Sequence, residues 1–490
     1  MLTRILLVAL ALTLGAQTYG QLAEPTHKDD VPVLILPALD NLSLNKQYNK
    51  DQGNKPFRFA EARDVSLSIL EDGLWEKSAE GRLIWRQAIE SKNAYSINLA
   101  FTSFKLAGDA ELYIFNEDKS DLYGPFTEKD NDDHEQLWTP LVSGDRIYIH
   151  LEISPEYLKS TKLEVGRVNH DFADVQKGLQ SGSCNLDVAC GAADGWPIVD
   201  RYREIISSVG AYTLNGIDQC SGVLINNTAQ DCKPLFLTAN HCNVGPGTSQ
   251  SIVVYWNYEN STCRQPDSFE SGLAGDGQRN TFNSGSTHLA SLFDSDFTLL
   301  ELDDPIDPTL NLFFSGWDLS YELPDTSICV HHPAVEEKRI SFEFDRLEYD
   351  PTGQDTAYIQ VNDWDIGTTE GGSSGSPLYN AEGRIIGQLF GGLAACGNDE
   401  YDTYGWIRYS FEGRGGVTNS LKHWLDPLGL GPEFLDGRSC SFNLDVSNNF
   451  FQVCGLDTDA VSVDLFPSEF FESPVNYEIV SADAGLQLEL

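Results

Sequence analysis

Three short segments carry residue types that could together hydrolyse a peptide bond. The first is a Gly- and Ser-rich run in which flanking glycines permit a tight turn that exposes the hydroxyl of Ser374. The second places His241 beside Cys242 after an apolar strand, and the third places Asp296 at the head of another. A serine hydroxyl is a weak nucleophile that needs a base oriented by a third group. The order His, Asp, Ser therefore predicts a catalytic triad.

The run around Ser374 could also stabilise developing negative charge. The backbone N–H groups of Gly372 and Ser374 are predicted to form an oxyanion hole, in which losing one donor typically costs about 3 kcal/mol of barrier. Taken singly, the three signals could be a flexible loop, a structural histidine and a turn aspartate. A non-enzymatic binding protein therefore stays open as the distant alternative.

The elements that would hold these residues resemble short strands. Between residues 178 and 436, apolar runs are separated by Gly, Asn, Asp and Pro, which favours a β-barrel or sandwich. These runs are Leu235–Leu237, Ile252–Trp256, Phe297–Leu302, Tyr358–Val361 and Ile385–Phe390. Over residues 417–425, four apolar side chains share one helical face before a Pro, which predicts a helix.

Three further segments flank this region. Residues 1–20 are predicted to be a signal peptide, because a basic start, an apolar run and small residues follow one another. Residues 21–177 lack cysteine and are predicted to be a β-rich propeptide with strands at Ala94–Phe101, Ala110–Phe115 and Arg146–Ile153. Residues 437–490 are interpreted as a β-rich extension that could stop before its domain is complete.

Charge and cysteine content narrow the function classes. The formal net charge is −42, which disfavours nucleic acid as a partner because phosphates would be repelled. The acidity either attracts cationic substrates or, more simply, keeps an exported protein soluble. Ten cysteines without C-x-x-C spacing, none before Cys184, favour disulfides over a metal site. We expect no metal and no cofactor.

The motifs resemble those of the trypsin-like serine peptidases, and more closely those of the bacterial lysyl endopeptidases. The resemblance covers roughly residues 178–436 and rests on the triad segments together with Gly182–Cys190, Ser251–Cys263, His331–Ile340 and Trp424–Pro427. It implies a trypsin-like domain of two six-stranded antiparallel β-barrels with the active site between them and a C-terminal helix. With the preceding prodomain, the expected fold class is all-β.

The resemblance also implies a disulfide framework. Its expected pairs are Cys184–Cys396, Cys190–Cys263 and Cys220–Cys242. The other four cysteines have no counterpart in the family. By elimination they suggest Cys440–Cys454 and, more weakly, Cys232–Cys329, and their pairing is left open.

Substrate choice follows from the same resemblance. In the family a carboxylate at the base of the primary pocket receives the cation of the substrate, and the matching residue is Asp402. Asp399 and Glu400 lie on the same loop and are interpreted as solvated. Gly391 and Gly392 are expected to offer backbone to an extended substrate.

Two observations favour Lys over Arg as the residue before the cleaved bond. The processing point of the family matches Lys177–Gly178, so the enzyme could release itself. Residues 1–177 contain 12 Lys and 7 Arg, whereas residues 178–490 contain 3 Lys and 10 Arg. A protease that avoids its own target would show this reversal. Compositional drift and an enzyme that accepts both residues remain the alternatives.

The sequence departs from the family beside the triad. Phe390 stands where better-known members have a His, and Tyr349 is the nearest candidate for their stacking Trp. His331 and His332 would point to opposite faces of a strand and are interpreted as structural. We expect a secreted, extracellular monomer that acts on proteins or peptides and has no membrane association once its signal is removed.

Overall fold

The computed structural model describes residues 31–49, 55–175, 181–350 and 357–440. Most of its regular secondary structure is β-strand, which confirms the expected all-β fold class. Its α-helices in these ranges are short: α1 (Asn41–Asn49), α2 (Arg203–Ser207), α3 (Ile407–Glu412) and α4 (Lys422–Leu425). We refer to residues 31–175 as the N-terminal region and to residues 181–440 as the C-terminal region.

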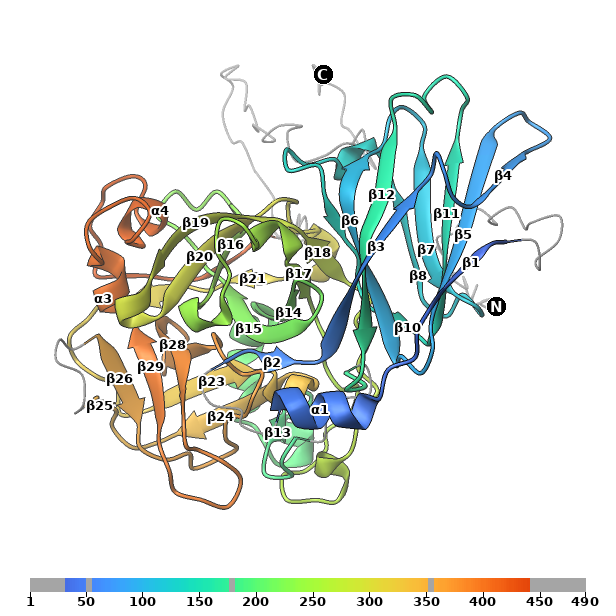
Figure 1. Cartoon of the computed structure of the whole chain (residues 1–490). Helices are drawn as coiled ribbons and strands as arrows, with labels where there is room; N and C mark the ends of the chain where they lie inside the picture. The colour runs from blue at the N-terminus through green and yellow to red at the C-terminus, as the bar shows by residue number, and fades with distance from the viewer. Residues whose placement is uncertain (1–30, 50–54, 176–180, 351–356, 441–490) are drawn as a thin grey trace, which may run out of the picture. The chain divides into compact units, whose positions relative to one another are not determined.

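The N-terminal region contains two β-sheets with one apolar core between them (Figure 1). The first sheet has the order β1-β5-β11-β7-β8, with β4 beside β5, and its strands are β1 (Val33–Leu36), β4 (Leu74–Lys77), β5 (Leu83–Ser91), β7 (Glu111–Asn116), β8 (Leu122–Phe126) and β11 (Arg146–Ile153). The second has the order β10-β6-β12-β3, with β9 beside β6, and its strands are β3 (Ala60–Ser68), β6 (Ser96–Lys105), β9 (Leu137–Trp138), β10 (Val142–Ser143) and β12 (Lys162–Asp171).

The C-terminal region contains the two larger sheets. One has the order β18-β17-β14-β15-β16-β20-β19, with strands β14 (Val209–Leu214), β15 (Asp218–Leu224), β16 (Leu235–Ala239), β17 (Val253–Tyr255), β18 (Phe282–Ser284), β19 (Ser286–Leu292) and β20 (Phe297–Leu302). The other has the order β13-β24-β23-β27-β28-β29-β26-β25, with strands β13 (Leu186–Asp187), β23 (Ser327–His331), β24 (Arg339–Glu343), β25 (Glu348–Tyr349), β26 (Tyr358–Val361), β27 (Pro377–Asn380), β28 (Ile385–Gly392) and β29 (Asp402–Trp406).

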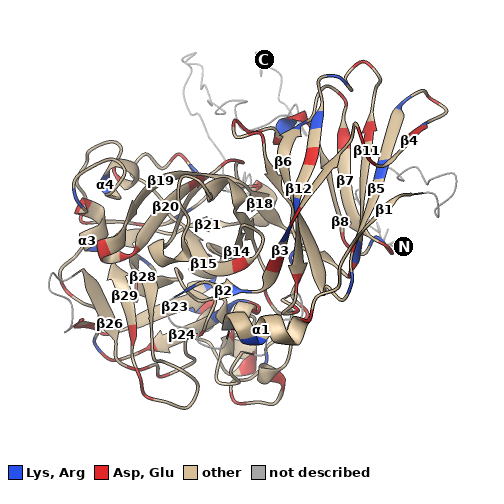
Figure 2. Ribbon diagram, viewed as in Figure 1, with Lys and Arg blue, Asp and Glu red and all other residues tan. Residues whose placement is uncertain are grey.

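Both of these sheets contain more than the six strands expected of a barrel, and short additional segments pair with inner strands of each. Strand β2 (Phe57–Arg58) comes from the N-terminal region and pairs antiparallel with β15. Strands β22 (Trp317–Asp318) and β30 (Phe434–Leu435) join the second sheet, while β21 (Phe313–Phe314) and β31 (Arg438–Ser439) form a separate pair. Acidic residues are scattered over the strands and loops of both regions (Figure 2).

The helix predicted over residues 417–425 is shorter than expected. Only α4 is helical there, and the residues before it form a turn in which the Asn419 side chain accepts from the Gly416 amide. Val417 is exposed, and its carbonyl accepts a hydrogen bond from the Trp424 indole at 2.9 Å. A turn therefore replaces the first part of the predicted helix, because the Asn419 side chain binds a backbone amide in place of the helical hydrogen bonds.

The apolar core of the C-terminal region extends across both of its sheets. One continuous cluster contains Val223 and Leu237 from the first sheet and Ile328 and Phe342 from the second, and α3 and α4 pack against it. The two sheets are therefore joined by buried apolar contacts.

Candidate active site

His241 lies on a single helical turn that follows β16. Cys242, the next residue, is bonded to Cys220 of the neighbouring strand β15, as the family resemblance implied. The disulfide ties the turn to the sheet, and the His241 side chain is only 11% exposed. The imidazole is therefore presented from a rigid element.

Asp296 is brought to His241 by strand pairing. Strands β16 and β20 are antiparallel with Ala239 opposite Phe297, which places the residue before β20 beside the residues after β16. The Asn240 and His241 amides donate to the Asp296 backbone oxygen and Oδ1 at 2.7 and 2.8 Å. Asp296 has φ +56, a left-handed conformation that Asp adopts more readily than most residues.

The two side chains form a direct hydrogen bond. His241 Nδ1 lies 2.7 Å from Asp296 Oδ2, so Nδ1 carries the proton and Nε2 is free to accept one. Asp296 is 2% exposed, and burial raises its pKa while the bonds from His241 oppose that rise. A neutral imidazole oriented in this way is the arrangement that a general base requires.

Ser374 sits in a tight turn against the same strands. Gly372 and Gly375 adopt φ +97 and +82, which only glycine does readily. The Ser374 carbonyl accepts from the Ser221 amide at 2.9 Å and lies 3.9 Å from Cys242 Sγ. The turn is thus fastened beside the His241 segment.

One expected contact is missing from this arrangement. His241 Nε2 is buried and has no hydrogen-bond partner among the described residues, so it makes no bond to the Ser374 hydroxyl. Catalytic hydrogen bonds are often long in ligand-free enzymes and shorten when substrate binds. Within the described residues, the amides of Gly372 and Ser374 also make no hydrogen bond to the protein.

Asp402 lies at the start of β29 and is 1% exposed. Its Oδ2 accepts from Trp364 Nε1 at 2.8 Å and from Thr369 Oγ1 at 2.7 Å. Burial raises the pKa of this carboxyl, and the two donors counteract the rise. A side chain at Gly392 would begin 2.4 Å from Oδ1, so glycine leaves that oxygen approachable.

The rival acids on this loop, Asp399 and Glu400, are exposed, as their interpretation as solvated residues required. Trp364 and Thr369 were not foreseen, because no local pattern marks a residue that donates to a carboxylate many positions away. The Gly and Thr content before Ser374 gave the only hint that this segment lies near the site.

Phe390 contacts the imidazole of His241 edge-on, with ring centroids 5.8 Å apart and an interplanar angle of 88°. The Phe390 ring also contacts the Tyr358 ring, with centroids 5.3 Å apart. Tyr349 is partly exposed and contacts Trp406, with no ring contact to His241. The aromatic neighbour of His241 is therefore Phe390.

The two adjacent histidines are buried in the protein interior. His331 Nδ1 lies 2.8 Å from the hydroxyl of Ser373, the residue before Ser374, and burial lowers the pKa of His331 to about 3. His332 Nδ1 contacts the Glu336 carbonyl at 2.9 Å, and burial also lowers its pKa. Both contacts fit a structural role. Within the described residues, no three ligand-type side chains of this site lie close enough to share a metal ion.

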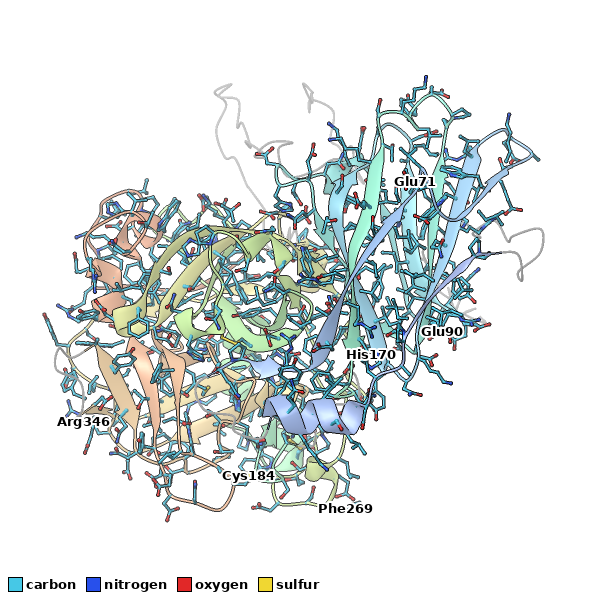
Figure 3. The ribbon with its side chains drawn as sticks, in the orientation of Figure 1. Glu71, Glu90, His170, Cys184, Phe269 and Arg346 are labelled. Carbon is cyan, nitrogen blue, oxygen red and sulfur yellow. A yellow bond between two sulfur atoms is a disulfide. The ribbon has the colours of Figure 1, made fainter. Side chains whose placement is uncertain are left out.

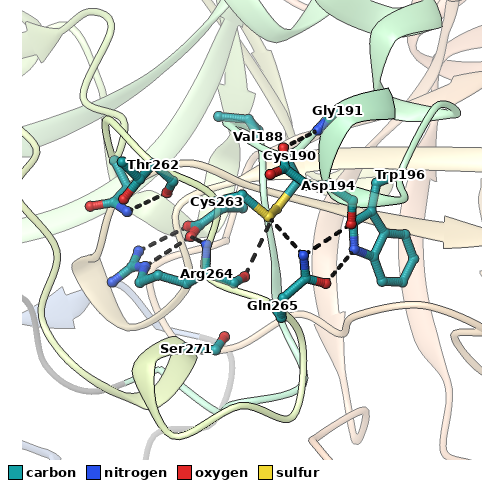
Figure 4. The surroundings of a disulfide bond; sticks show 12 residues. Val188, Cys190, Gly191, Asp194, Trp196, Thr262, Cys263, Arg264, Gln265 and Ser271 are labelled. Atoms are coloured by element: carbon teal, nitrogen blue, oxygen red, sulfur yellow. Dashed lines mark hydrogen bonds and ion pairs between the residues drawn. A yellow bond between two sulfur atoms is a disulfide. The ribbon is translucent and has the colours of Figure 1, made fainter.

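All three disulfides implied by the resemblance are present, including Cys184–Cys396 (Figure 3) and Cys190–Cys263 (Figure 4). The pairing suggested for the others was wrong. Cys232 is bonded to Cys440, because β31 brings the chain back beside the first sheet, and Cys329 is a buried free thiol. Cys454 lies outside the described residues.

Next to Cys263, Arg264 donates to Asp187 with donor–acceptor distances of 2.8 and 2.9 Å, and both side chains are buried. This pair ties the loop that follows Cys263 to strand β13. The expected processing residues, Lys177 and Gly178, lie outside the described residues.

Comparison with known proteins finds similarity to lysyl endopeptidases. Residues 179–405 match the family model for the C-terminal domain of lysyl endopeptidase. A lysyl endopeptidase of Pseudomonas aeruginosa (strain PAO1) is 27% identical over 366 residues, which cover 68% of this chain and 73% of that protein. Residues 179–405 are therefore similar to the C-terminal domain of the lysyl endopeptidases. The chain is accordingly a serine endopeptidase that acts on proteins or peptides.

Solved structures of serine proteases are more distant. A Glu endopeptidase is 17% identical with a TM-score of 0.29, covering 41% of this chain and 85% of its own. The HtrA-type protease AlgW with a tripeptide is 16% identical with a TM-score of 0.31, covering 44% and 60%. These scores are low and add nothing to that similarity.

Proposed function

We propose that this endopeptidase cleaves after Lys, with Ser374 as nucleophile, His241 as general base and Asp296 as its orienting carboxylate. The hydrogen-bonded His241–Asp296 pair beside the Ser374 turn is the observation on which the proposal rests. His241 Nε2 takes the Ser374 proton as the hydroxyl attacks the substrate carbonyl. His241 then protonates the leaving amine, and water hydrolyses the acyl-enzyme.

The oxyanion of the tetrahedral intermediate would be held by the amides of Gly372 and Ser374. Because these donors are fixed before substrate arrives, they stabilise charge that develops only in the transition state. Gly391 and Gly392, at the end of β28, would pair with the extended substrate backbone.

The surroundings of Asp402 support Lys as the preferred residue. An ammonium 4 Å from a carboxylate gains about 4 kcal/mol at an effective dielectric constant near 20, before desolvation is counted. Asp402 Oδ2 already accepts from Trp364 and Thr369, which leaves Oδ1 as the more available oxygen. A guanidinium binds a carboxylate best when both oxygens are free, whereas an ammonium needs only one.

Two further parts of the proposal concern maturation. Residues 1–20 would direct secretion, and disulfides suit an oxidising compartment. In the described part of the chain, no helix is long and apolar enough to cross a membrane. Residues 21–177 would be a propeptide removed after Lys177, and the pairing of β2 with β15 gives it a defined attachment. The mature domain would begin at Gly178 and act as a monomer, with residues 437–490 as an extension.

The test is digestion of an unrelated protein followed by mapping of the new termini, with matched Lys and Arg peptides alongside. We expect cleavage after Lys and at least about tenfold slower cleavage after Arg. Ser374→Ala should stay folded and lose activity. Equal cleavage of the two peptides would contradict Lys preference, and full activity of Ser374→Ala would contradict the nucleophile assignment.

A further inference from the structure

A turn of unusual backbone geometry lies under the loop that precedes the nucleophile. Ala334 has φ +48 and ψ +29, and Val335 has φ +66. Two consecutive non-glycine residues in the left-handed region are uncommon, and a β-branched residue there is an outlier. Such a conformation persists only where its surroundings determine it.

The turn is held from several sides. Glu336 N donates to the Pro333 carbonyl at 2.9 Å and closes it. The Val335 carbonyl accepts from Arg279 Nη2 at 2.7 Å, and Arg279 stacks on the Tyr258 ring at 4.3 Å. The turn is therefore fixed by polar contacts on its backbone.

Apolar packing holds the Val335 side chain. It is completely buried in a cluster that contains Ile217, Val253 and Tyr255 of the C-terminal region and Phe57 of the N-terminal region. Burial of a valine of this kind stabilises the position it occupies, so the side chain anchors a backbone conformation that it would not otherwise adopt.

The turn makes direct contact with the proposed oxyanion loop. Ala334 N–H donates to the Gly371 carbonyl at 2.7 Å. A side chain at Gly372 would begin 3.1 Å from Val335 N. In a trans peptide unit the carbonyl and the following N–H point in opposite directions. The bond from Ala334 therefore decides which way the Gly372 N–H points.

The next peptide unit is held as well. Ser221 Oγ donates to the Gly372 carbonyl at 2.9 Å and accepts from His332 N at 3.2 Å. The strand that carries Ser221 and the segment that leads into the turn thus hold Gly372 from both sides. Neither peptide unit flanking Gly372 can rotate without breaking one of these bonds.

From this geometry we propose that the Ala334–Val335 turn positions the oxyanion-hole donor, with Val335 as the side chain that anchors it. The proposal rests on the assignment of Ser374 and Gly372 under the proposed function. Neither Ala334 nor Val335 touches substrate; they act through the peptide unit between Gly371 and Gly372.

The test compares Val335→Ala with Val253→Ala, a matched control that removes the same atoms from the same cluster but lies on β17, which pairs with β14 and β18. Each variant is expressed as the full chain and assayed in the form it yields. The measurements are kcat, KM and inhibition by two compounds. A peptide aldehyde ending in Lys forms an adduct that places an oxygen in the oxyanion hole. A simple alkylamine occupies only the primary pocket.

For Val335→Ala we expect kcat and aldehyde affinity to fall together by about tenfold or more, since losing one oxyanion donor costs about 100- to 1,000-fold. Its KM and alkylamine inhibition should match those of Val253→Ala, as should its unfolding temperature. Equal losses of kcat in both variants, or equal weakening of both inhibitors by Val335→Ala, would overturn the proposal.

A second pair covers the case in which Val335→Ala fails to fold. Ala334→Asn keeps the N–H and tolerates positive φ, whereas Ala334→Val disfavours it. We expect the Asn variant to retain the parental kcat and the Val variant to lose it at unchanged KM. Parental kcat in both would refute the positioning role. A parent without peptidase activity would instead refute the proposed function.

Discussion

At the scale of single residues, Trp364 offers the most direct test of whether the hydrogen bonds to Asp402 affect substrate preference. Trp364→Phe removes one of the two donors to Oδ2 while keeping most of the ring. A hydrogen bond to a charged group contributes about 1.5–3 kcal/mol. We expect kcat/KM for Lys peptides to fall at least about tenfold, and the ratio of Lys to Arg cleavage to fall with it.

The matched control is Trp196→Phe, which removes an indole donor to Gln265 on the surface. Initial rates on paired Lys and Arg peptides should be unchanged in that variant. If Trp364→Phe keeps the parental ratio of Lys to Arg cleavage, the hydrogen bonds to Oδ2 do not affect the preference for Lys. The two oxygens of Asp402 would then be equivalent toward the substrate.

The residues proposed to react could be predicted from the sequence, whereas the donors to the proposed pocket carboxylate could not. Ser374, His241 and Asp296 each lie in a segment whose neighbours have a physical reason to be there, such as the flanking glycines or the adjacent cysteine. Trp364 and Thr369 donate hydrogen bonds to Asp402, which lies more than thirty positions later. Nothing in the sequence around them predicts that contact.

At the scale of elements, the turn that carries Ser374 depends on a close approach of backbone to backbone. A methyl group at Gly375 would begin 2.2 Å from Thr238 Oγ1 and 2.5 Å from the Ser221 carbonyl, at φ +82. Gly375→Ala should therefore lower the free energy of unfolding by about 2 kcal/mol or more and abolish activity.

Gly247→Ala serves as the control for this substitution, because a methyl group there would meet nothing within 4 Å. Thermal unfolding followed by circular dichroism provides the measurement. A Gly375→Ala variant with the unfolding temperature of Gly247→Ala would show that the turn can shift to admit a side chain.

Strands were predicted better than the helix, for a physical reason. Strands β20 and β26 begin and end at the residues predicted for them, 297–302 and 358–361. Apolar runs between turn residues identify buried strands well. The predicted helix at 417–425 shortened to α4, because the apolar spacing that favours a helix also arises when a turn folds back on itself. The Cys232–Cys440 bond depends on the position of β31, and no hydrophobic periodicity in the sequence predicts that strand.

At the scale of the whole molecule, an acidic cavity of about 310 Å³ lies where the N-terminal and C-terminal regions meet. Asp130, Asp132 and Asp304 line it, and nearby His134 contacts Asp303 at 3.1 Å. Burial and the surrounding carboxylates raise the pKa of Asp304 to about 7 and that of Asp132 to about 6. The described lining includes no Lys or Arg to offset this charge.

These shifts make the stability of the full chain depend on pH. A carboxyl whose pKa is higher in the folded state stabilises the fold at low pH, and the effect is lost as pH rises through the folded value. For Asp304 the loss should run from near pH 4 to about pH 7. Asp304→Asn should therefore match the parent at pH 4 and exceed its stability by about 1–3 kcal/mol at pH 8.

Unfolding should be measured on a Ser374→Ala background, so that the chain stays intact. Asp64→Asn, at a side chain that is 84% exposed, is the matched control and should leave the pH profile unchanged. If the free energy of unfolding of Asp304→Asn depends on pH in the same way as that of the parent, the neighbouring carboxylates do not raise the pKa of Asp304.

The crossed disulfides have a practical consequence. Cys184–Cys396 and Cys232–Cys440 interleave along the chain, with sequence separations of 212 and 208. A clip between positions 232 and 396 leaves two fragments that both bonds still tether. A self-digested sample should therefore migrate as one band on a gel without reductant and as several with it, and damage could pass unnoticed in any purity check that omits the thiol.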